Sequence, residues 1–269
     1  MDQIRKVPIL QRVETASISQ ITERIAKACA ETPGGVVAFD GDGTLWSGDV
    51  GEDFFHALLE NADFRAPARA AMESDVAEFG LAITGSALDL ARGLYAAYRD
   101  GRYPEERTCE MMTWACADWA REEVDAFAEK VVHGLGSRLH GEAIAALEWA
   151  RDAKIEVLLV SASPRPVVEA AGRVVGIDGA HVFAATPTYD GAIMLPRVVR
   201  PIPYGPGKVG AIRAYAKARP LYAAFGDNVF DLAMLTEARV AVAVRPKSRL
   251  RERAHEVHGI VEIQPILAP

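Results

Sequence analysis

Apolar residues recur in two different ways within the first forty positions of the chain. Between residues 14 and 30 they return every three or four positions, which predicts a helix with one apolar face. These positions are Ile18, Ile21, Ile25 and Ala28. The segment 36–40 is instead a continuous apolar run, rich in β-branched residues, that ends in an aspartate. Such a run is typical of a strand that is buried on both faces of a sheet.

The next ninety residues, from 48 to about 140, carry only helical patterns. Residues 86–98 are apolar around most of the helix circumference, which indicates a helix buried in a bundle. Residues 121–132 place their apolar positions on one face. The helical pattern then stops at a cluster of glycines, Gly134, Gly136 and Gly141.

Strands and helices alternate over the rest of the chain. The expected strands are 155–160, 181–185, 221–225 and 240–244. The expected helices are 142–152, 164–175, 207–218, 230–237 and a basic, solvated one at 245–258, with a hairpin turn at 189–192. This alternation predicts an α/β fold whose core is a Rossmann-like parallel sheet. The core is assigned to residues 1–48 and 141–269, and an all-helical domain at 49–140 is inserted into it.

Composition narrows the range of partners. The chain has 269 residues, of which 50% are hydrophobic and 25% charged, with a net charge of −7. This balance is ordinary for a globular protein and argues against nucleic acid or an anionic membrane surface as a partner. No apolar run reaches membrane-spanning length, and residues 1–6 lead into no apolar signal core. Three cysteines without close spacing indicate reduced thiols and a cytoplasmic location, while the oligomeric state stays open.

Polar side chains follow several of the expected strands at the point where each strand ends. Asp40 and Asp42 follow the first strand among glycines, Ser161 follows the second, and Asp227 follows a later one. Because parallel strands end at the same edge of a sheet, these side chains are expected to converge. Three carboxylates at one place favour a divalent cation such as Mg²⁺. Ser161 and Lys208, which lies just inside a helix, suit the oxygens of a phosphoryl group.

Each of these residues taken alone also has a purely structural interpretation. Asp-Gly sequences are common in turns, and Ser161 is placed to cap the helix that follows it. A single lysine such as Lys208 is usually solvated, and Asp227 and Asp231 suit a helix cap and a first-turn acid. The occurrence of all of them together, at the ends of parallel strands, favours the chemical interpretation.

Four motifs, in this order, resemble those of the haloacid-dehalogenase-like phosphatases. They are Phe39-Asp40-Gly41-Asp42-Gly43-Thr44, then Leu159-Val160-Ser161, then Lys208, then Gly226-Asp227-Asn228-Val229-Phe230-Asp231. The helical insert is similar in position to the C1-type cap of the phosphoserine-phosphatase-like branch. Two positions depart from the family pattern. Phe230 stands where phosphoserine-specific members usually carry asparagine, and Gly41 stands where a bulkier residue is common.

The resemblance implies a mechanism in two chemical steps. Asp40 would attack phosphorus and form an aspartyl-phosphate. Asp42 would protonate the leaving group and then take a proton from the attacking water. Ser161 and Lys208 would bind the phosphoryl oxygens.

The resemblance also implies a metal site and a substrate site. Mg²⁺ would be held by Asp40, by the backbone carbonyl of Asp42 and by Asp227, with Asp231 orienting the metal shell. The expected substrate is a small phosphorylated metabolite. The residues expected around it are Gly43, Thr44, Asp49, Ser163 and Asn228.

The helical cap is expected to select the substrate. Asp49 lies where phosphoserine-specific relatives use an acid to hold the substrate amine, although an N-cap for the following helix explains it equally well. Two further groups invite the same double interpretation. Three tryptophans form either ordinary core or an aromatic wall that binds a quaternary ammonium, such as that of phosphocholine. Three arginines either bind a carboxylate of the substrate or are solvated at the surface. They are Trp46, Trp114 and Trp119, and Arg65, Arg69 and Arg92.

Two other classes of function use similar residues. A phosphotransferase or mutase would share the chemistry of Asp40 but pass the phosphoryl group to a second hydroxyl instead of water. A non-catalytic phospho-acceptor module also gathers acids and a lysine at strand ends. Such a module would be shorter than this chain, would need no cap, and would not place an acid two positions after the nucleophile.

Overall fold

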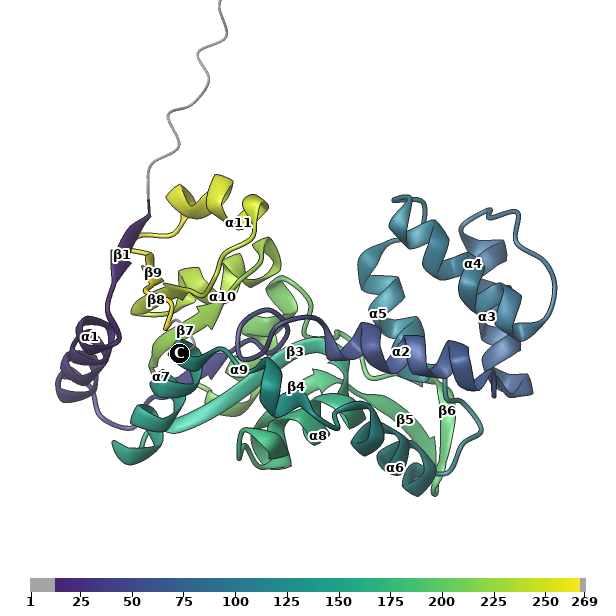
Figure 1. The fold of residues 1–269 in the computed structure, drawn as a ribbon, viewed down its shortest axis with the longest axis horizontal. Helices are drawn as coiled ribbons and strands as arrows, with labels where there is room; N and C mark the ends of the chain where they lie inside the picture. The colour runs from purple at the N-terminus through teal and green to yellow at the C-terminus, as the bar shows by residue number, and fades with distance from the viewer. Residues whose placement is uncertain (1–12, 267–269) are drawn as a thin grey trace, which may run out of the picture.

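The computed structural model describes residues 13–266, so the residues expected to lack a signal core, 1–6, lie outside the described part. A seven-stranded sheet with the order β1-β9-β8-β7-β2-β3-β4 forms the centre of the molecule (Figure 1). Every neighbouring pair in this sheet is parallel. Its strands are β1 (Glu14–Ala16), β2 (Val36–Phe39), β3 (Glu156–Pro164), β4 (Val182–Ala185), β7 (Leu221–Gly226), β8 (Val240–Ala243) and β9 (Val261–Ile263).

Strand β2 lies in the middle of the sheet, between β3 and β7, and all four of its residues are buried. Successive side chains of a strand point to opposite faces, so β2 contributes to two separate cores. Val37 and Phe39 belong to the larger core, whereas Val36 and Ala38 belong to the smaller one. The rings of Phe39 and Phe225, which are paired in register across β2 and β7, stack with their centroids 4.2 Å apart. The predicted buried central strand is confirmed.

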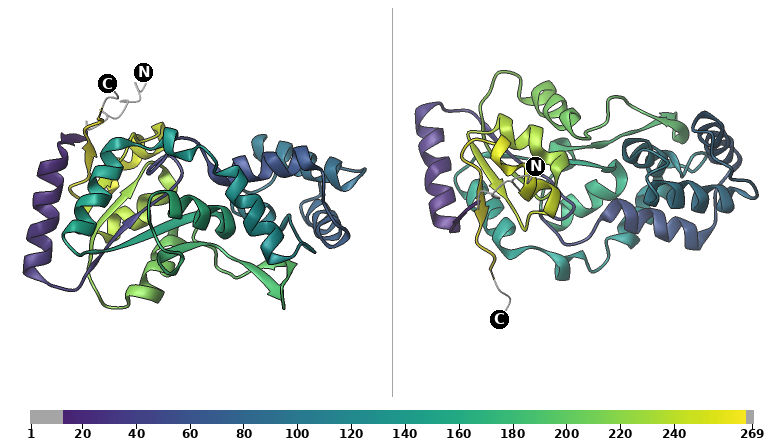
Figure 2. Two further views of the ribbon diagram at one scale, coloured as in Figure 1. Left: turned by 60° about the horizontal axis from the view of Figure 1, so that its bottom comes forward. Right: turned by 90° about the horizontal axis from the view of Figure 1, so that it is seen from above.

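Helices cover both faces of the sheet. Contacts between elements place α1, α7 and α8 on the side of the larger core, and α9 and α10 on the other (Figure 2). The bounds of these helices and of the last one are α1 (Ile18–Glu31), α7 (Gly141–Asp152), α8 (Arg165–Val174), α9 (Pro206–Ala216), α10 (Leu232–Glu237) and α11 (Ser248–Arg253). This three-layer arrangement confirms the predicted α/β class with a Rossmann-like parallel sheet.

The residues between Asp49 and His140 form a separate helical lobe at the end of the molecule away from α1 (Figure 1). No strand of the described structure falls within this segment. Its helices are α2 (Val50–Asn61), α3 (Ala66–Glu78), α4 (Ala87–Arg99), α5 (Glu105–Trp114), α6 (Arg121–Val131) and the 3₁₀ turn η1 (Leu135–Arg138).

A hairpin from the second part of the chain joins this lobe. Strands β5 (Pro187–Asp190) and β6 (Ile193–Val198) pair with each other and pack against α5 and α3. The backbone N–H of Asp118 donates to the carbonyl of Met194, and that of Arg121 donates to the carbonyl of Ala192, both at 2.8 Å. The lobe is therefore built from two stretches of sequence, and the boundaries 49–140 remain a prediction.

The elements predicted near the two ends of the chain need correction. The helix expected from residue 14 begins at Ile18, because Ser17 caps it in a capping box with Gln20. Glu14–Ala16 instead pairs with Val261–Ile263, a strand that the sequence pattern did not predict. Three residues are too few to display a period, and their pairing depends on a partner almost 250 positions away. The basic helix expected at 245–258 is short, covering Ser248–Arg253.

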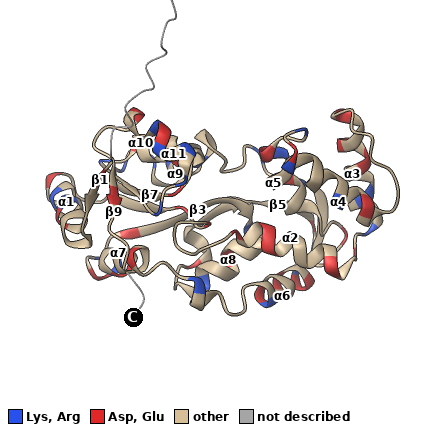
Figure 3. Cartoon of the chain, turned by 45° about the horizontal axis from the view of Figure 1, so that its top comes forward, with Lys and Arg blue, Asp and Glu red and all other residues tan. Residues whose placement is uncertain are grey.

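None of the described helices combines the length and apolarity that a membrane crossing requires. Outer helices such as α1 and α6 carry both signs of charge along their length (Figure 3). The three cysteines, Cys29, Cys109 and Cys116, are free thiols. A cytoplasmic location and the exclusion of nucleic acid stay predictions.

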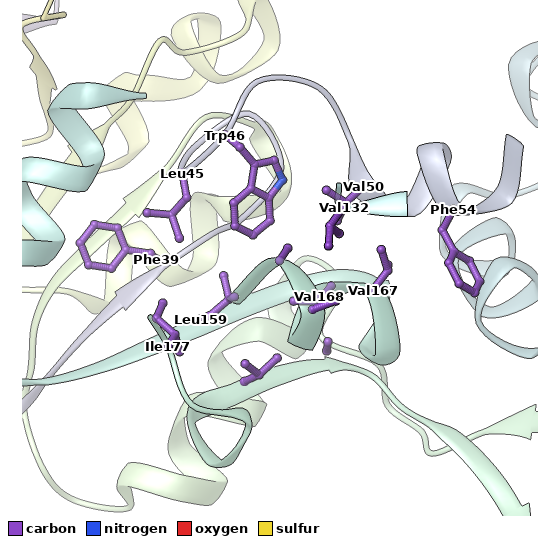
Figure 4. Packing of buried hydrophobic residues seen from close by; sticks show 14 of the residues in the cluster. Phe39, Leu45, Trp46, Val50, Phe54, Val132, Leu159, Val167, Val168 and Ile177 are labelled. Atoms are coloured by element: carbon purple, nitrogen blue, oxygen red, sulfur yellow. The ribbon is translucent and has the colours of Figure 1, made fainter. Parts of the chain in front are cut away.

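The chain leaves the core and returns to it through two adjoining segments. The backbone N–H of Ser47 donates to the carbonyl of Arg138, and that of His140 donates to the carbonyl of Leu45. Apolar packing continues across this junction, where Trp46 lies between Phe39 of the core and Val50 at the start of the lobe (Figure 4). The imidazole of His140 is buried there, and its Nδ1 lies 3.1 Å from the carbonyl oxygen of Thr44.

Burial lowers the pKa of His140 below its ordinary value, so this histidine is expected to destabilise the fold in acid. Below the ordinary histidine pKa of about 6.5 the unfolded chain takes up a proton that the folded chain refuses. His140→Gln should therefore make the free energy of unfolding fall less steeply as the pH drops through this region. Urea unfolding of both proteins at a series of pH values measures the difference. A difference that stays constant with pH would contradict the assignment.

Candidate active site

A pocket opens at the carboxyl ends of β2, β3 and β7. It collects side chains from the sheet core and from the helical lobe. Its lining residues are Asp40, Asp42, Asp49, Glu105, Cys109, Ser161, Ala162, Ser163, Tyr204, Lys208, Asp227, Asn228, Phe230, Asp231 and Lys247. Nine of the eleven residues predicted for the site from the sequence therefore lie around one cavity.

Asp40 occupies the floor of the pocket and is 5% exposed. Its Oδ1 accepts a hydrogen bond from Lys208 Nζ at 2.5 Å, and its Oδ2 accepts one from Thr44 Oγ1 at 3.0 Å. Burial, together with the neighbouring charge of Asp231, holds the pKa of Asp40 well above its usual value, against the opposing effect of Lys208. A carboxylate in this position depends on positive charge beside it to stay ionised.

The carboxylate of Asp42 is fixed by four donors. Trp46 Nε1 and the backbone N–H of Val50 donate to its Oδ1 at 2.9 and 2.7 Å. The hydroxyls of Ser163 and Ser161 donate to its Oδ2 at 2.7 and 3.3 Å. The two aspartates of the first motif thus have separate surroundings, one among charges and one among neutral donors.

The second group of acids lies at the end of β7. Carboxylate oxygens of Asp40, Asp227 and Asp231 lie within 4.8 Å of one another, and all three residues are buried. Lys208 bridges two of them, because its Nζ is 2.5 Å from Asp231 Oδ1 as well as from Asp40. Burial and the charge of Asp231 raise the pKa of Asp227 to about 6.

This cluster fits a hard divalent cation. Buried carboxylates crowded at this distance repel one another, and oxygen ligands are those that Mg²⁺ prefers. Asp231 Oδ2 also accepts hydrogen bonds from the backbone N–H groups of Asp227 and Asn228, which orients it within the cluster. The carboxylate of Asp42 is not part of this group, so a metal contact through its backbone carbonyl stays a prediction.

Residues 37–236, more than half of the chain, match the haloacid dehalogenase-like hydrolase family. The chain belongs to this family.

Two curated relatives match part of the chain. Phosphoserine phosphatase SerB1 of Mycobacterium tuberculosis is 33% identical over 135 residues, which are 45% of this chain and 43% of that protein. A Mycobacterium leprae hydrolase is 32% identical over a stretch of the same length, 45% of this chain and 44% of its own. The chain thus covers less than half of the length of the curated relatives it matches.

Solved structures agree on the fold. A protein of unknown function from Bordetella pertussis Tohama I has a TM-score of 0.65 at 22% identity, covering 85% of this chain and 97% of that one. A substrate-bound phosphoserine phosphatase has a TM-score of 0.52 at 14% identity, covering 84% and 92%. At these identities the solved structures show that the chain shares its fold with both proteins.

Two residues predicted to lie around the substrate, Thr44 and Gly43, belong to the loop after β2 and do not line the pocket. Thr44 is fully buried and its hydroxyl orients Asp40. Gly43 has a φ of +85°, and a Cβ on it would come within 2.1 Å of Asp227 Oδ2. The absence of a side chain at Gly43 is what lets the first and fourth motifs approach each other.

Asp49 caps a helix, which is one of the two interpretations that the sequence left open, whereas a contact with a substrate amine stays a prediction. Its carboxylate caps α2 by accepting a hydrogen bond from the backbone N–H of Glu52 at 2.8 Å, and it also lines the pocket. Burial first, and then the nearby Asp42, hold the pKa of Asp49 well above its usual value.

Of the two interpretations of the three tryptophans, the structure supports ordinary core, because all three are buried and none lines the pocket. Trp46 is completely buried in the core, and Trp119 donates its indole N–H to the carbonyl of Asp63. The three arginines, for which carboxylate binding and solvation were both open, also lie outside the pocket lining. Arg65 pairs with Glu123 at 3.1 Å, and Arg69 pairs with Glu73 at 2.9 Å.

Six lining residues were not predicted from the sequence as part of the site, and one of them, Ala162, lies between the two serines Ser161 and Ser163. Glu105 and Cys109 come from α5 of the lobe, and Tyr204, Phe230 and Lys247 come from loops of the core. The rings of Tyr204 and Phe230 lie 4.7 Å apart. Phe230 alone carried a signal, as the departure from asparagine in the fourth motif. The others lie in no motif, and the loop with Lys247 reads as an ordinary basic surface.

Gly43→Ala should disrupt the metal cluster more than the fold. Gly134 provides a matched control, because its φ is also +85° but no atom lies within 4 Å of the position of an added Cβ. Gly134→Ala should cost about 1 kcal/mol of stability through backbone strain and leave Mg²⁺ binding intact. Gly43→Ala should in addition abolish the rise in melting temperature that Mg²⁺ produces. Equal responses of the two variants to Mg²⁺ would contradict the close packing of Gly43 on Asp227.

Proposed function

We propose that this chain is a Mg²⁺-dependent phosphatase that hydrolyses a small phosphomonoester through an aspartyl-phosphate intermediate. The observation that carries the proposal is that the two aspartates of the first motif have different neighbours. Asp40 faces Lys208 and the acid cluster, whereas Asp42 is held by serine hydroxyls, an indole and a backbone N–H. Nucleophilic attack and proton transfer require these two different environments.

In the first step a carboxylate oxygen of Asp40 attacks phosphorus, and the bond from phosphorus to the ester oxygen breaks. Thr44 holds the attacking carboxylate in place through its hydroxyl, so the attack needs little rotation of the side chain. Asp42 donates its proton to the departing oxygen, and the leaving group departs as a neutral alcohol.

In the second step a water molecule attacks the phosphorus of the aspartyl-phosphate. Asp42, now ionised, takes a proton from this water, and the bond between phosphorus and the oxygen of Asp40 breaks. Inorganic phosphate leaves, and both aspartates return to their starting forms. Ser161 and Ser163, which donate to Oδ2 of Asp42, keep that carboxylate aimed at the same place in both steps.

Asp40 and Asp227, oriented by Asp231, would hold Mg²⁺. When bound, the ion supplies positive charge that offsets the negative charge of the phosphoryl oxygens. Lys208 supplies a second positive charge from the protein itself, and its ammonium is fixed by two carboxylates.

The wall of the pocket beyond these groups favours an amine-bearing leaving group. Asp49 and Glu105 add two carboxylates that the chemistry does not use, and no arginine of the described residues lines the pocket. Tyr204 and Phe230 provide aromatic surface next to them. A cation beside acids and aromatic rings is stabilised by both. Phosphoserine and phosphocholine are the two candidates, and the relative named phosphoserine phosphatase supports the first.

Removal of either aspartate should separate the two chemical roles. Purified protein is expected to release phosphate from an aryl phosphate with Mg²⁺ and to stop when a chelator is added. Asp40→Asn should abolish formation of a phosphorylated protein, and Asp42→Asn should slow both its formation and its breakdown. Each change should reduce kcat by about 10²-fold or more. Mass spectrometry of the acid-quenched protein locates the phosphoryl group.

Three outcomes would contradict this assignment. Activity that persists in chelator would remove Mg²⁺ from the mechanism. A phosphoryl group on a residue other than Asp40 would remove the nucleophile. Transfer to an added alcohol in preference to water would favour a phosphotransferase on the same scaffold.

Two variants test the leaving-group side. Asp49→Asn removes the charge but keeps an N-cap for α2. Glu105→Gln removes the charge of the acid on α5. Each should lower kcat/KM for an amine-bearing phosphomonoester by about tenfold, the usual order for a lost charged hydrogen bond. Each should leave hydrolysis of an uncharged aryl phosphate nearly unchanged. Equal losses of kcat/KM on both substrates would show that Asp49 and Glu105 maintain the structure and do not contact the amine.

A further inference from the structure

Lys247 makes two contacts with one residue of the acid cluster. Its Nζ lies 2.9 Å from Asp227 Oδ2, and its backbone N–H donates to the carbonyl oxygen of Asp227 at 2.8 Å. It belongs to the loop between β8 and α11, which follows the last of the four family motifs. Side chain and backbone together therefore fix this loop to the end of β7.

The two lysines of the pocket differ in how firmly they are held. The side chain of Lys208 is 5% exposed and bridges two carboxylates. The side chain of Lys247 is 56% exposed and pairs with Asp227 alone. An ammonium group on a long, half-exposed side chain can move into water at little cost, whereas a buried one cannot. Lys247 is thus the displaceable cation of the site.

Asp227 is also one of the three residues that would hold the divalent cation of the proposed function. A cation that binds this carboxylate must share it with the ammonium of Lys247 or displace that group. In both cases the positive charges of the Lys247 ammonium and the metal ion come close to the same buried carboxylate. Their mutual repulsion is strong because little water is present to screen it.

We propose that Lys247 is a positioning residue that sets the divalent-cation affinity of the site by competing for Asp227. Its ammonium keeps the buried carboxylate aligned, and it lowers the affinity for Mg²⁺ by the same contact. This inference rests on the proposed function, because it assumes that Asp227 is a metal ligand.

Calorimetric titration with MgCl₂ tests the inference without any substrate. Lys247→Met and Lys247→Gln remove the charge and keep the backbone contact, so both should bind Mg²⁺ about tenfold more tightly than the unchanged protein. Lys247→Arg keeps the charge and should bind Mg²⁺ with nearly the original affinity.

Arg249→Met provides a matched control for overall charge. Arg249 lies two positions further along, over the ring of Phe230 at 5.5 Å, and forms no ion pair among the described residues. The affinity of this variant for Mg²⁺ should stay within about twofold of that of the unchanged protein, because solvent screens a charge that lies on the surface away from the acid cluster. Circular dichroism of each variant verifies that the fold is retained.

Two results would overturn the inference. Unchanged or weaker binding of Mg²⁺ by both uncharged Lys247 variants would show that the ammonium does not compete with the metal. An equal gain in Arg249→Met would show a general charge effect in place of a contact with Asp227. If the unchanged protein and all variants fail to bind Mg²⁺, the metal assignment in the proposed function fails as well. Binding by the unchanged protein distinguishes the two failures.

Discussion

The structure depends on the concentration of negative charge at one edge of a buried parallel sheet. Asp40, Asp227 and Asp231 are each at most 5% exposed, and their oxygens crowd within 4.8 Å. Such a group is unstable unless cations and fixed donors surround it. Lys208 meets part of this need by contacting two of the acids at 2.5 Å each. The remaining negative charge is the physical reason for expecting a divalent cation.

The surroundings of the acids follow from this constraint. The hydroxyl of Thr44 fixes Oδ2 of Asp40, and the backbone N–H groups of Asp227 and Asn228 both fix Oδ2 of Asp231, so these two acids are held in place. Gly43 lets the catalytic loop approach Asp227 without a side chain between them. A site arranged in this way is preorganised, because its groups are already in position before a ligand binds.

The helical lobe adds a different kind of surface to the same pocket. Helix α5 contributes Glu105, and the core loops contribute Tyr204 and Phe230, so the outer wall is made by segments from both sides. The end of the pocket that holds the acid cluster is defined by motifs that a family shares. Apart from Phe230, the residues named for the outer end lie in no motif, and members of one family differ in substrate through such residues.

The sequence alone determined the central strand, the α/β class, the order of the four motifs and the convergence of Asp40, Asp42, Ser161 and Asp227. These features are local, because a strand and the loop that follows it lie within a few residues of each other. Tertiary structure alone decided the rest. It moved Trp46 into the core, paired Glu14–Ala16 with Val261–Ile263, and brought Glu105 and Lys247 to the pocket. These placements depend on packing between distant segments, and no pattern within either segment encodes which partner it will meet.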